Sequence, residues 1–205
     1  MIRRPPRSTQ GVSSAASDVY KRQRIPIYMS AIFPRMVKVA GRVADGIAMG
    51  AVLSAPYARD VIQASARSSA EASDRDPKSL GFLMASIVSV DEDPEVARQC
   101  AREALCRLFA PLPHPYYEYM LREQGFSKAA DAALKYVRTG NIEKAAESMT
   151  DEVVDTVTIA GTLEECRRRL AEYEGVVEEV IFVNVSYATS KTTSAVEGYR
   201  KLLAL

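Results

Sequence analysis

The stretch that most constrains the fold is Ile25–Gly50, where a strand, a helix and a second strand follow one another directly. Ile25–Ala31 is apolar and β-prone, and Ile47–Met49 is again short and apolar. Between them lies Pro34, whose fixed φ and missing N–H suit the first position of a helix. The fifteen residues that separate the two strands are too many for a hairpin and fit a helical crossover. The stretch therefore predicts a βαβ unit with parallel strands.

The helix of this unit carries apolar residues at the spacing of one helical face. They are Met36, Val39, Ala40, Val43 and Ala44. We expect this stripe to face the sheet. The short link Ile32-Phe33 brings backbone N–H groups to the start of the helix, and such a helix N-terminus is a ready anion-binding site.

Two more strand–helix units follow along the chain. The long apolar run Leu80–Val90 predicts a strand buried on both faces, followed by a helix over Pro94–Phe109 that Asp93 can cap. A last strand is predicted at Glu179–Val185, and a closing helix at Thr192–Leu203. With the two strands of the first unit, this makes four strands, each followed by a helix.

Between the third and the last of these strands, Ala110–Val157 reads as an insertion of several short helices without a strand. The expected helices are Tyr116–Gln124, Ser127–Thr139, Ile142–Ser148 and Asp151–Val157. After the insertion, Thr162 and Glu165 have the spacing of a capping box, which starts another helix.

The repeated strand–helix order predicts a parallel sheet with right-handed crossovers. A complete (β/α)8 TIM barrel needs about 250 residues. Only 181 residues remain once the first 24 are set aside. The prediction is therefore an α/β fold, the C-terminal half of a (β/α)8 TIM barrel over residues 25–205, with a helical insertion over 110–157 before the last strand.

Residues 1–24 do not share this pattern. They hold six Lys or Arg against one Asp, are rich in Ser and Pro, and have no apolar periodicity. They lack the apolar core of a secretory signal. The segment resembles translated sequencing-adapter sequence, so we interpret it as a non-native, disordered tail; a basic targeting or nucleic-acid-binding arm is the alternative.

Charge and composition narrow the range of partners. The whole chain has a net charge of +1, and residues 25–205 alone have 21 basic against 25 acidic residues. A mildly acidic folded part gives no reason to expect nucleic acid, and no apolar run is long enough to span a membrane. The three cysteines form no C-x-x-C motif and the single histidine is His114. The sequence thus predicts no metal site and no disulfide framework, in a reducing, cytoplasmic setting.

Three stretches resemble one known family, in the family's order. The first is PIYMSAIFPRMVKVAGRVADGIAMG, which is similar to the P-[IV]-Y-[IV]-A-A-x-G-P-x-[MV]-x-x-[LY]-A-G-x-x-A-D-G segment of the luciferase-like monooxygenases. Its matching residues are Pro26, Ile27, Tyr28, Ala31, Pro34, Met36, Ala40, Gly41, Ala44, Asp45 and Gly46. The other two are Ile87–Ala97 and Ala160–Phe182. This superfamily uses flavins or deazaflavins and includes methylenetetrahydromethanopterin reductases.

The resemblance implies where a cofactor would bind. In this family the loop after the first matching strand holds the phosphate of the cofactor, either FMN or a deazaflavin (coenzyme F-420). The residues at the matching positions are Ala31, Ile32, Phe33 and Arg35, and Phe33 stands where the family often has Gly. The resemblance also implies that the insertion borders a small-molecule substrate pocket and that the full-length parent is a homo-oligomer. No catalytic residue can be assigned from the sequence.

Two hypotheses for the function follow. The first is a fragment of a flavin- or deazaflavin-dependent oxidoreductase or monooxygenase that transfers hydride between its cofactor and a small organic substrate. The second is a non-catalytic helical interaction module built on residues 116–157. For the 205-residue chain by itself we expect open sheet edges, self-association and no enzymatic activity.

Overall fold

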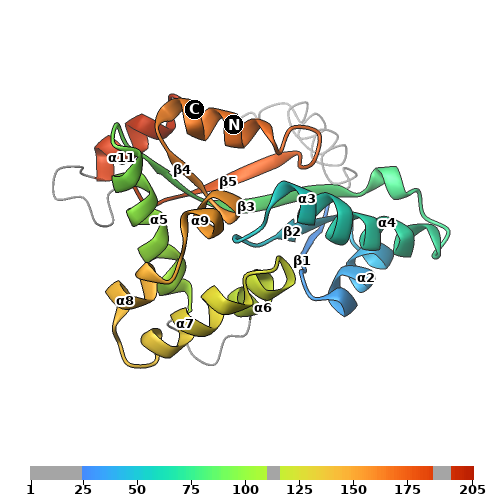
Figure 1. The fold of residues 1–205 in the computed structure, drawn as a ribbon. Coiled ribbons are helices and arrows are strands. Elements are labelled where there is room, and N and C mark those ends of the chain that lie inside the picture. The colour runs from blue at the N-terminus through green and yellow to red at the C-terminus, as the bar shows by residue number, and fades with distance from the viewer. Residues whose placement is uncertain (1–24, 110–115, 187–194) are drawn as a thin grey trace, which may run out of the picture.

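The computed structural model describes residues 25–109, 116–186 and 195–205 (Figure 1). Within them the chain forms a single sheet with helices packed around it. The strands are β1 (Tyr28–Ser30), β2 (Gly46–Met49), β3 (Gly81–Val90), β4 (Ile159–Gly161) and β5 (Glu179–Asn184). The predicted segment 1–24 and His114 lie outside the described residues.

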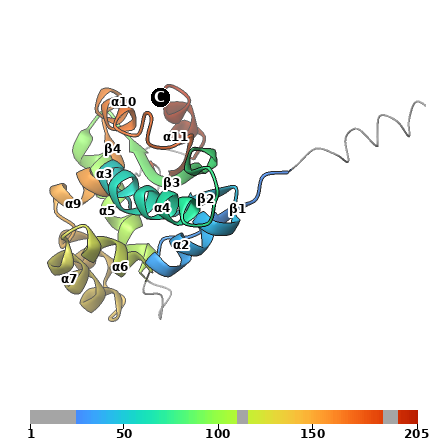
Figure 2. The same cartoon turned by 90° about the vertical axis from the view of Figure 1, so that its right-hand side faces the viewer.

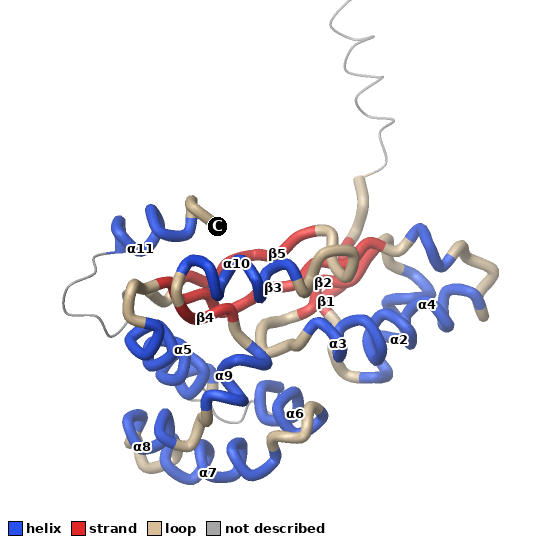
Figure 3. The backbone as a smooth tube through the Cα atoms, turned by 45° about the horizontal axis from the view of Figure 1, so that its top comes forward, coloured by secondary structure: helices blue, strands red, loops and turns tan. Residues whose placement is uncertain are grey.

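All the strand pairs are parallel, as predicted. β1 pairs with β2, β2 pairs with β3, and β3 pairs with both β4 and β5. Figure 3 shows the strands as one continuous sheet. β2 aligns with the first half of β3, through Met84, whereas β4 aligns with its last residues, Val88–Val90. β3 is thus the strand that joins the sheet together.

The strand prediction is wrong in two places. The described part has five strands and the sequence predicts four, because β4 is not predicted. Its three residues follow directly on a helix and are too few to show an alternating pattern. The helical segment consequently precedes β4, not the last strand. The first strand is also shorter than predicted, beginning at Tyr28. Ile25 and Ile27, expected within it, are 81% and 69% exposed.

The helices before residue 110 follow the predicted order. They are α2 (Pro34–Val43), α3 (Ala55–Tyr57), α4 (Ala64–Glu71) and α5 (Pro94–Leu108). A π-helical stretch, Ala58–Gln63, joins α3 to α4 in one continuous helical run. Asp93 caps α5 by accepting a hydrogen bond from the Glu95 amide at 2.9 Å.

The helices after residue 115 are α6 (Tyr116–Glu123), α7 (Ser127–Val137), α8 (Ile142–Glu147), α9 (Asp151–Val157), α10 (Leu163–Ala171) and α11 (Ala195–Leu202). The helices α6–α9 agree with the prediction to within two residues at each end, whereas the predicted start of the closing helix, Thr192, lies outside the described residues. The capping box of α10 is confirmed, with both of its hydrogen bonds present between Thr162 and Glu165. No helix in the described ranges is long and apolar enough to cross a membrane.

The predicted inner face of α2 is only partly correct, because Ala40 and Ala44 are buried but the other three predicted residues are not. The residues that the structure buries are Val37, Ala40 and Gly41, whereas Met36 and Val39 are each 41% exposed and Val43 is 72% exposed. Gly41 explains the rotation, because a Cβ atom there would lie 2.3 Å from the carbonyl oxygen of Ala66 in α4. The bare glycine lets the two helices approach closely, and Figure 2 shows them side by side.

The helices α6–α9 are part of the main core. Met120, Ala133, Ala146 and Val153 are buried in the same apolar cluster as the residues of β2 and β3. Polar contacts add to this packing. The buried Arg102 of α5 donates to Glu95 at 2.6 Å, to the carbonyl of Met149 at 3.0 Å and to Asp151.

The two faces of the sheet are covered unequally. Side chains on one face pack into the core, including Ile47, Phe82 and Met84, each at most 3% exposed. On the opposite face Leu83 and Ala85 of β3 are half-buried. Ile181 of β5, paired in register with Ala85, is 52% exposed. Parallel sheets are normally covered on both faces, and the described residues leave this face partly open.

The α2–α4 contact can be tested with Gly41→Ala. In an ordinary helix interior this change stabilises a protein by roughly 1 kcal/mol. Here we expect the opposite sign, a loss of about 1–3 kcal/mol, because the new methyl group would overlap backbone atoms of Ala66. Urea denaturation measures the free energy of unfolding. Val39→Ala, on the exposed side of the same helix, is the control and should change it by less than about 1 kcal/mol. A more stable Gly41→Ala variant would contradict the packing.

Candidate active site at the C-terminal edge of the sheet

The parallel strands direct their C-terminal ends, and the loops that follow, to one edge of the sheet. In barrel enzymes the active site lies at this edge. The loops after β1 and β2 are residues 31–33 and 50–54. Asp91 and Thr162 follow β3 and β4. The candidate site residues from the sequence all lie in the first loop or in the first turn of α2.

The structure places these four residues in different environments. Ala31 and Ile32 are buried, at 4% and 5% exposed. The amide of Ala31 donates to the carbonyl of Ala48 at 3.4 Å, so it continues the sheet and is not free for an anion. Phe33 is the N-cap residue of α2 and Pro34 is its first residue. Arg35 follows, with an exposed side chain.

The start of α2 has uncapped amides. No side chain caps it, and the first intrahelical bond runs from the Val37 amide to the Phe33 carbonyl at 3.0 Å. Because Pro34 has no N–H, the donors that remain within the first turn of α2 are the amides of Arg35 and Met36. The helix dipole and the Arg35 guanidinium both favour a negative charge here.

The side chain of Phe33 points toward α6, the first helix of the segment α6–α9. Its ring lies 4.9 Å from that of Tyr119, and it meets the ring of Tyr116 edge-on at 6.4 Å, centroid to centroid. Both tyrosines belong to α6. The loop after β1 and the first helix of the segment are therefore in direct contact through aromatic side chains, a contact that the sequence did not predict.

The loop after β2 is also held by α6. The Gln124 side chain accepts a hydrogen bond from the Ser54 amide at 2.8 Å and donates to the Val52 carbonyl at 2.9 Å. Val52 is fully buried and has a φ of 73°, a conformation that β-branched residues rarely adopt. Gly50 approaches α6 so closely that a Cβ atom would lie 1.4 Å from the Tyr116 hydroxyl.

The tyrosine hydroxyls at this edge favour the neutral form. Burial, together with a hydrogen bond to the Tyr119 hydroxyl, raises the pKa of Tyr57 well above its usual value. Burial and the nearby Glu123 carboxylate raise the pKa of Tyr119. At neutral pH both groups can donate and accept hydrogen bonds, but they do not supply a charged base.

The acidic stretch after β3 has a structural role. Asp93 caps α5, as predicted, and Asp91 forms an ion pair with Lys201 at 3.0 Å. Partial burial alone would raise the pKa of Asp91, but hydrogen bonds from Lys201 and from the amides of Asp93 and Glu92 outweigh it, and the pKa is lowered. Asp91 is therefore a charged partner for Lys201 rather than a proton donor.

The thiols offer no nucleophile in the described residues. Cys100, Cys106 and Cys166 are free and buried, and burial raises the pKa of Cys106 and of Cys166 to about 12. The three cysteines are therefore small core residues in this structure. The described residues also contain no group of three or more His, Cys, Asp or Glu that could hold a metal ion.

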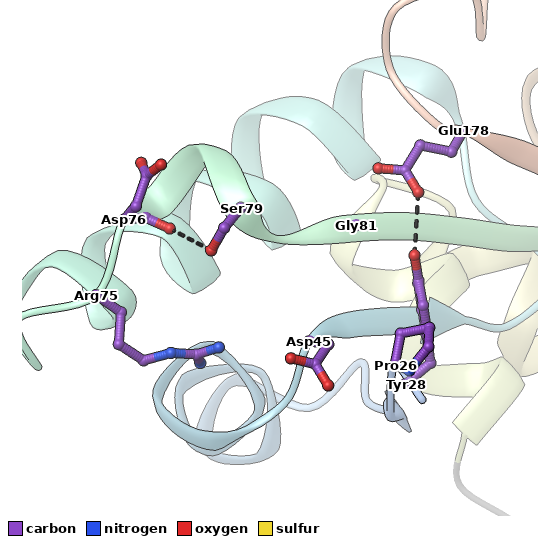
Figure 4. A pocket seen from close by; sticks show the side chains of 8 residues that line it. All are labelled: Pro26, Tyr28, Asp45, Arg75, Asp76, Ser79, Gly81 and Glu178. Atoms are coloured by element: carbon purple, nitrogen blue, oxygen red, sulfur yellow. Dashed lines mark hydrogen bonds between the residues drawn. The ribbon is translucent and has the colours of Figure 1, made fainter. Parts of the chain in front are cut away.

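A hollow at the opposite edge of the sheet is a separate feature (Figure 4). Its polar groups contact one another or the backbone. Tyr28 donates to Glu178 at 3.0 Å, Asp45 accepts from the Ile27 amide at 2.9 Å, and Arg75 donates to the carbonyls at the end of α2. Because it lies at the N-terminal ends of β1–β3, it is remote from the edge where barrel enzymes do their chemistry.

Comparison with known proteins identifies the family. The family model described as luciferase-like monooxygenase matches residues 3–177. The chain belongs to the luciferase-like monooxygenase family. The match begins within residues 1–24, which are outside the described part, so the foreign origin of that segment stays a prediction.

Relatives within the luciferase-like family include archaeal reductases. The 5,10-methylenetetrahydromethanopterin reductase of Methanolobus tindarius is 29% identical over 159 residues, 77% of this chain and 47% of the relative. The enzyme of the same name from Archaeoglobus fulgidus is 27% identical over 154 residues, 75% of this chain and 46% of the relative. The chain thus spans about half the length of the curated relatives it matches.

Solved structures of other proteins have a similar fold. A coenzyme F420-dependent tetrahydromethanopterin reductase from Methanopyrus kandleri has a TM-score of 0.64 at 19% identity, over 80% of this chain and 48% of that one. An F420-dependent secondary alcohol dehydrogenase has a TM-score of 0.57 at 17% identity, over 81% of this chain and 46% of that one. The prediction of a partial barrel of luciferase-like type is confirmed at the level of the fold.

The contact between α6 and the β2 loop generates a prediction. Gln124→Ala leaves the Val52 carbonyl and the Ser54 amide without their partner, so we expect a loss of about 1–3 kcal/mol in the free energy of unfolding. Hydrogen exchange at residues 50–54 should become faster. Gln99→Ala is the matched control, since this half-buried glutamine bonds to the side chain of Glu103. Equal effects of the two changes would show that Gln124 has no special role.

Proposed function

We propose that this chain forms part of a flavin- or deazaflavin-dependent oxidoreductase that transfers hydride between its cofactor and a small organic substrate. The observation that carries the proposal is the uncapped start of α2, with the Arg35 side chain beside it, at the C-terminal edge of a luciferase-like sheet. Membership of the family supports redox chemistry. The relatives' names include F420-dependent enzymes, so both FMN and deazaflavin stay open as the cofactor.

The phosphate of the cofactor would bind at the amides of Arg35 and Met36. These donors have no partner within α2, they lie at the positive end of the helix dipole, and the Arg35 guanidinium can add a charge-assisted hydrogen bond. Ile32 and Phe33 would form the floor and side of this phosphate site. The amide of Ala31 is already bonded to the carbonyl of Ala48, so Ala31 would hold the loop in place without donating to the phosphate.

The substrate would lie beside α6. The aromatic side chains of Phe33 and Tyr119 form an apolar wall at this edge, and the neutral Tyr57 and Tyr119 hydroxyls could orient a polar substrate group. When bound, the cofactor supplies the hydride chemistry, while these residues bind and orient. We therefore interpret α6–α9 as the border of the substrate pocket. The apolar faces of these helices are buried in the common core, which favours the enzyme over an independent helical module.

FMN and riboflavin, which differ by one phosphate, provide a test of the phosphate site in the chain itself. We expect FMN to shift the amide NMR signals of Arg35 and Met36, whereas riboflavin leaves them unchanged. Arg35→Glu should weaken FMN binding by roughly 5- to 150-fold, equivalent to about 1–3 kcal/mol, because a carboxylate would then face the phosphate.

The control for this charge reversal is Arg42→Glu, an exposed arginine at the other end of α2. It changes the net charge equally but should leave the affinity for FMN unchanged. The same titrations with coenzyme F420 would distinguish the two cofactors. If neither cofactor shifted the Arg35 and Met36 amides, or if both variants weakened binding equally, the proposed phosphate site would be wrong.

A further inference from the structure

The side chain of Tyr28 lies across two glycines of the neighbouring strands. The sheet pairs Tyr28 of β1 with Gly46 of β2, and Gly46 with Gly81 of β3. A Cβ atom at Gly46 would lie 2.3 Å from the Tyr28 ring, and one at Gly81 would lie 2.1 Å from the Tyr28 hydroxyl oxygen. The ring therefore occupies the space that two side chains would otherwise fill.

The far end of Tyr28 is bonded to the chain that enters β5. Its hydroxyl donates to the Glu178 carboxylate at 3.0 Å (Figure 4). Glu178 immediately precedes β5, and its amide donates to the carbonyl of Phe82 in β3 at 2.8 Å. One side chain thus connects β1 with β2, with β3 and with the start of β5, all at the N-terminal edge of the sheet.

Asp45 joins the same ends of β1 and β2. Its carboxylate accepts from the Ile27 amide at 2.9 Å, and its own amide donates to the Ile27 carbonyl at 2.9 Å. Tyr28, Asp45 and Gly46 are three of the residues that match the luciferase-like motif. None of the three lies in the loop after β1, so their arrangement gives this part of the motif a role apart from the proposed phosphate site.

The two glycines restrict the register in which β1 can pair. The described pairing of β1 with β2 covers three residues, and the register of glycine-rich strands is weakly specified by the backbone alone. A slip by one residue would turn Tyr28 to the opposite face of the sheet. A slip by two residues toward the C-terminal edge would place its ring on Ala48 and Leu83, which have side chains where the glycines have none.

We propose that Tyr28 is a positioning residue, whose ring on Gly46 and Gly81 fixes the register of β1 and with it the position of the loop that follows. This loop begins at Ala31, whose amide donates to the carbonyl of Ala48 at 3.4 Å in the observed register. A strand rises by about 3.3 Å per residue. A slip by one residue would therefore displace the start of α2 by a similar distance along β2.

A double-mutant cycle tests whether the ring and the glycine depend on each other. Gly81→Ala alone should lower the midpoint of urea denaturation, because the methyl group would displace the Tyr28 ring. In a Tyr28→Ala background the same change should raise the midpoint. Only the flexible end of Glu178 then remains among the atoms nearest to the methyl group, and alanine is otherwise favoured over glycine in a strand.

The matched control for this cycle is Met29→Ala, on the opposite face of the same strand. It also removes a side chain from β1 but leaves the Tyr28 ring on the glycines. In the Met29→Ala background, Gly81→Ala should therefore lower the midpoint, as it does in the wild-type chain. Equal effects of Gly81→Ala in the Tyr28→Ala and Met29→Ala backgrounds would overturn the proposal.

Hydrogen exchange tests the pairing of β1 directly. The amides of Ala31 and Asp45 donate across β1 and β2. In Tyr28→Ala both should exchange roughly tenfold faster than in the wild-type chain, whereas the Cys166 amide in α10 should keep its rate. Tyr28→Phe retains the ring and should keep the rates of both amides within about threefold of the wild-type values. Equally fast exchange in Tyr28→Phe and Tyr28→Ala, or an equal acceleration at Cys166, would contradict a register role of the ring.

Both experiments use the full chain without a cofactor, so their outcome is independent of the proposed function. A chain that passes both tests but does not respond to FMN would keep the role of Tyr28 and lose the phosphate site. A chain in which FMN shifts the Arg35 amide, but in which Tyr28→Ala leaves the Ala31 and Asp45 amides protected, would do the reverse.

Discussion

The pairing of β3 is the interaction on which the described structure depends. This strand is hydrogen-bonded to β2 along its first half, to β5 along its middle and to β4 at its end. Only β1 is attached to the sheet without pairing with it. The apolar run that forms β3 can be hydrogen-bonded and buried at once because it consists largely of residues such as Phe82, Met84, Ile87 and Val88. Since every neighbour is parallel to β3, all the loops that matter for the site lie at one edge.

The site itself depends on a second set of contacts, those that join α6 to this edge. Phe33 connects the loop after β1 to α6, and Gln124 connects the loop after β2 to the same helix. The two loops are separated along the chain by α2 and β2 but are positioned by one element. A site assembled in this manner has its shape before any ligand arrives, because the half-buried Gln124 side chain holds the Val52 backbone in an unfavourable conformation. The packing of α6 in the core offsets the free-energy cost of the positive φ at Val52.

The sequence could predict those features that have a period or a fixed chemical signature. Long strands such as β3, helix starts such as Asp93 and Thr162, and the family motif around Pro34 all lie in this class. It could not predict β4, whose three residues carry no period, nor the face of α2, where a close approach at Gly41 outweighed the apolar stripe. The contacts of Phe33 and Gln124 with other elements could not be predicted either. Residues so far apart along the chain show no pattern in a single sequence that would pair them. The four candidate residues lie in the loop after β1 and in the first turn of α2, and only the structure shows that the amide of Ala31 is already used by the sheet.

The charge at the start of α2 limits which part of a ligand the proposed phosphate site could bind. The free donors there are amides of one helical turn and an exposed guanidinium, groups that bind a phosphate rather than a flat ring. Toward α6 the surface changes to aromatic rings and to hydroxyls that burial keeps neutral. A ligand that satisfies both regions must have an anionic end and a less polar end, separated by the width of the loop after β1. Phosphorylated flavins and deazaflavins have this character, and the direction from Arg35 toward Tyr119 would then be the direction in which the reactive ring extends.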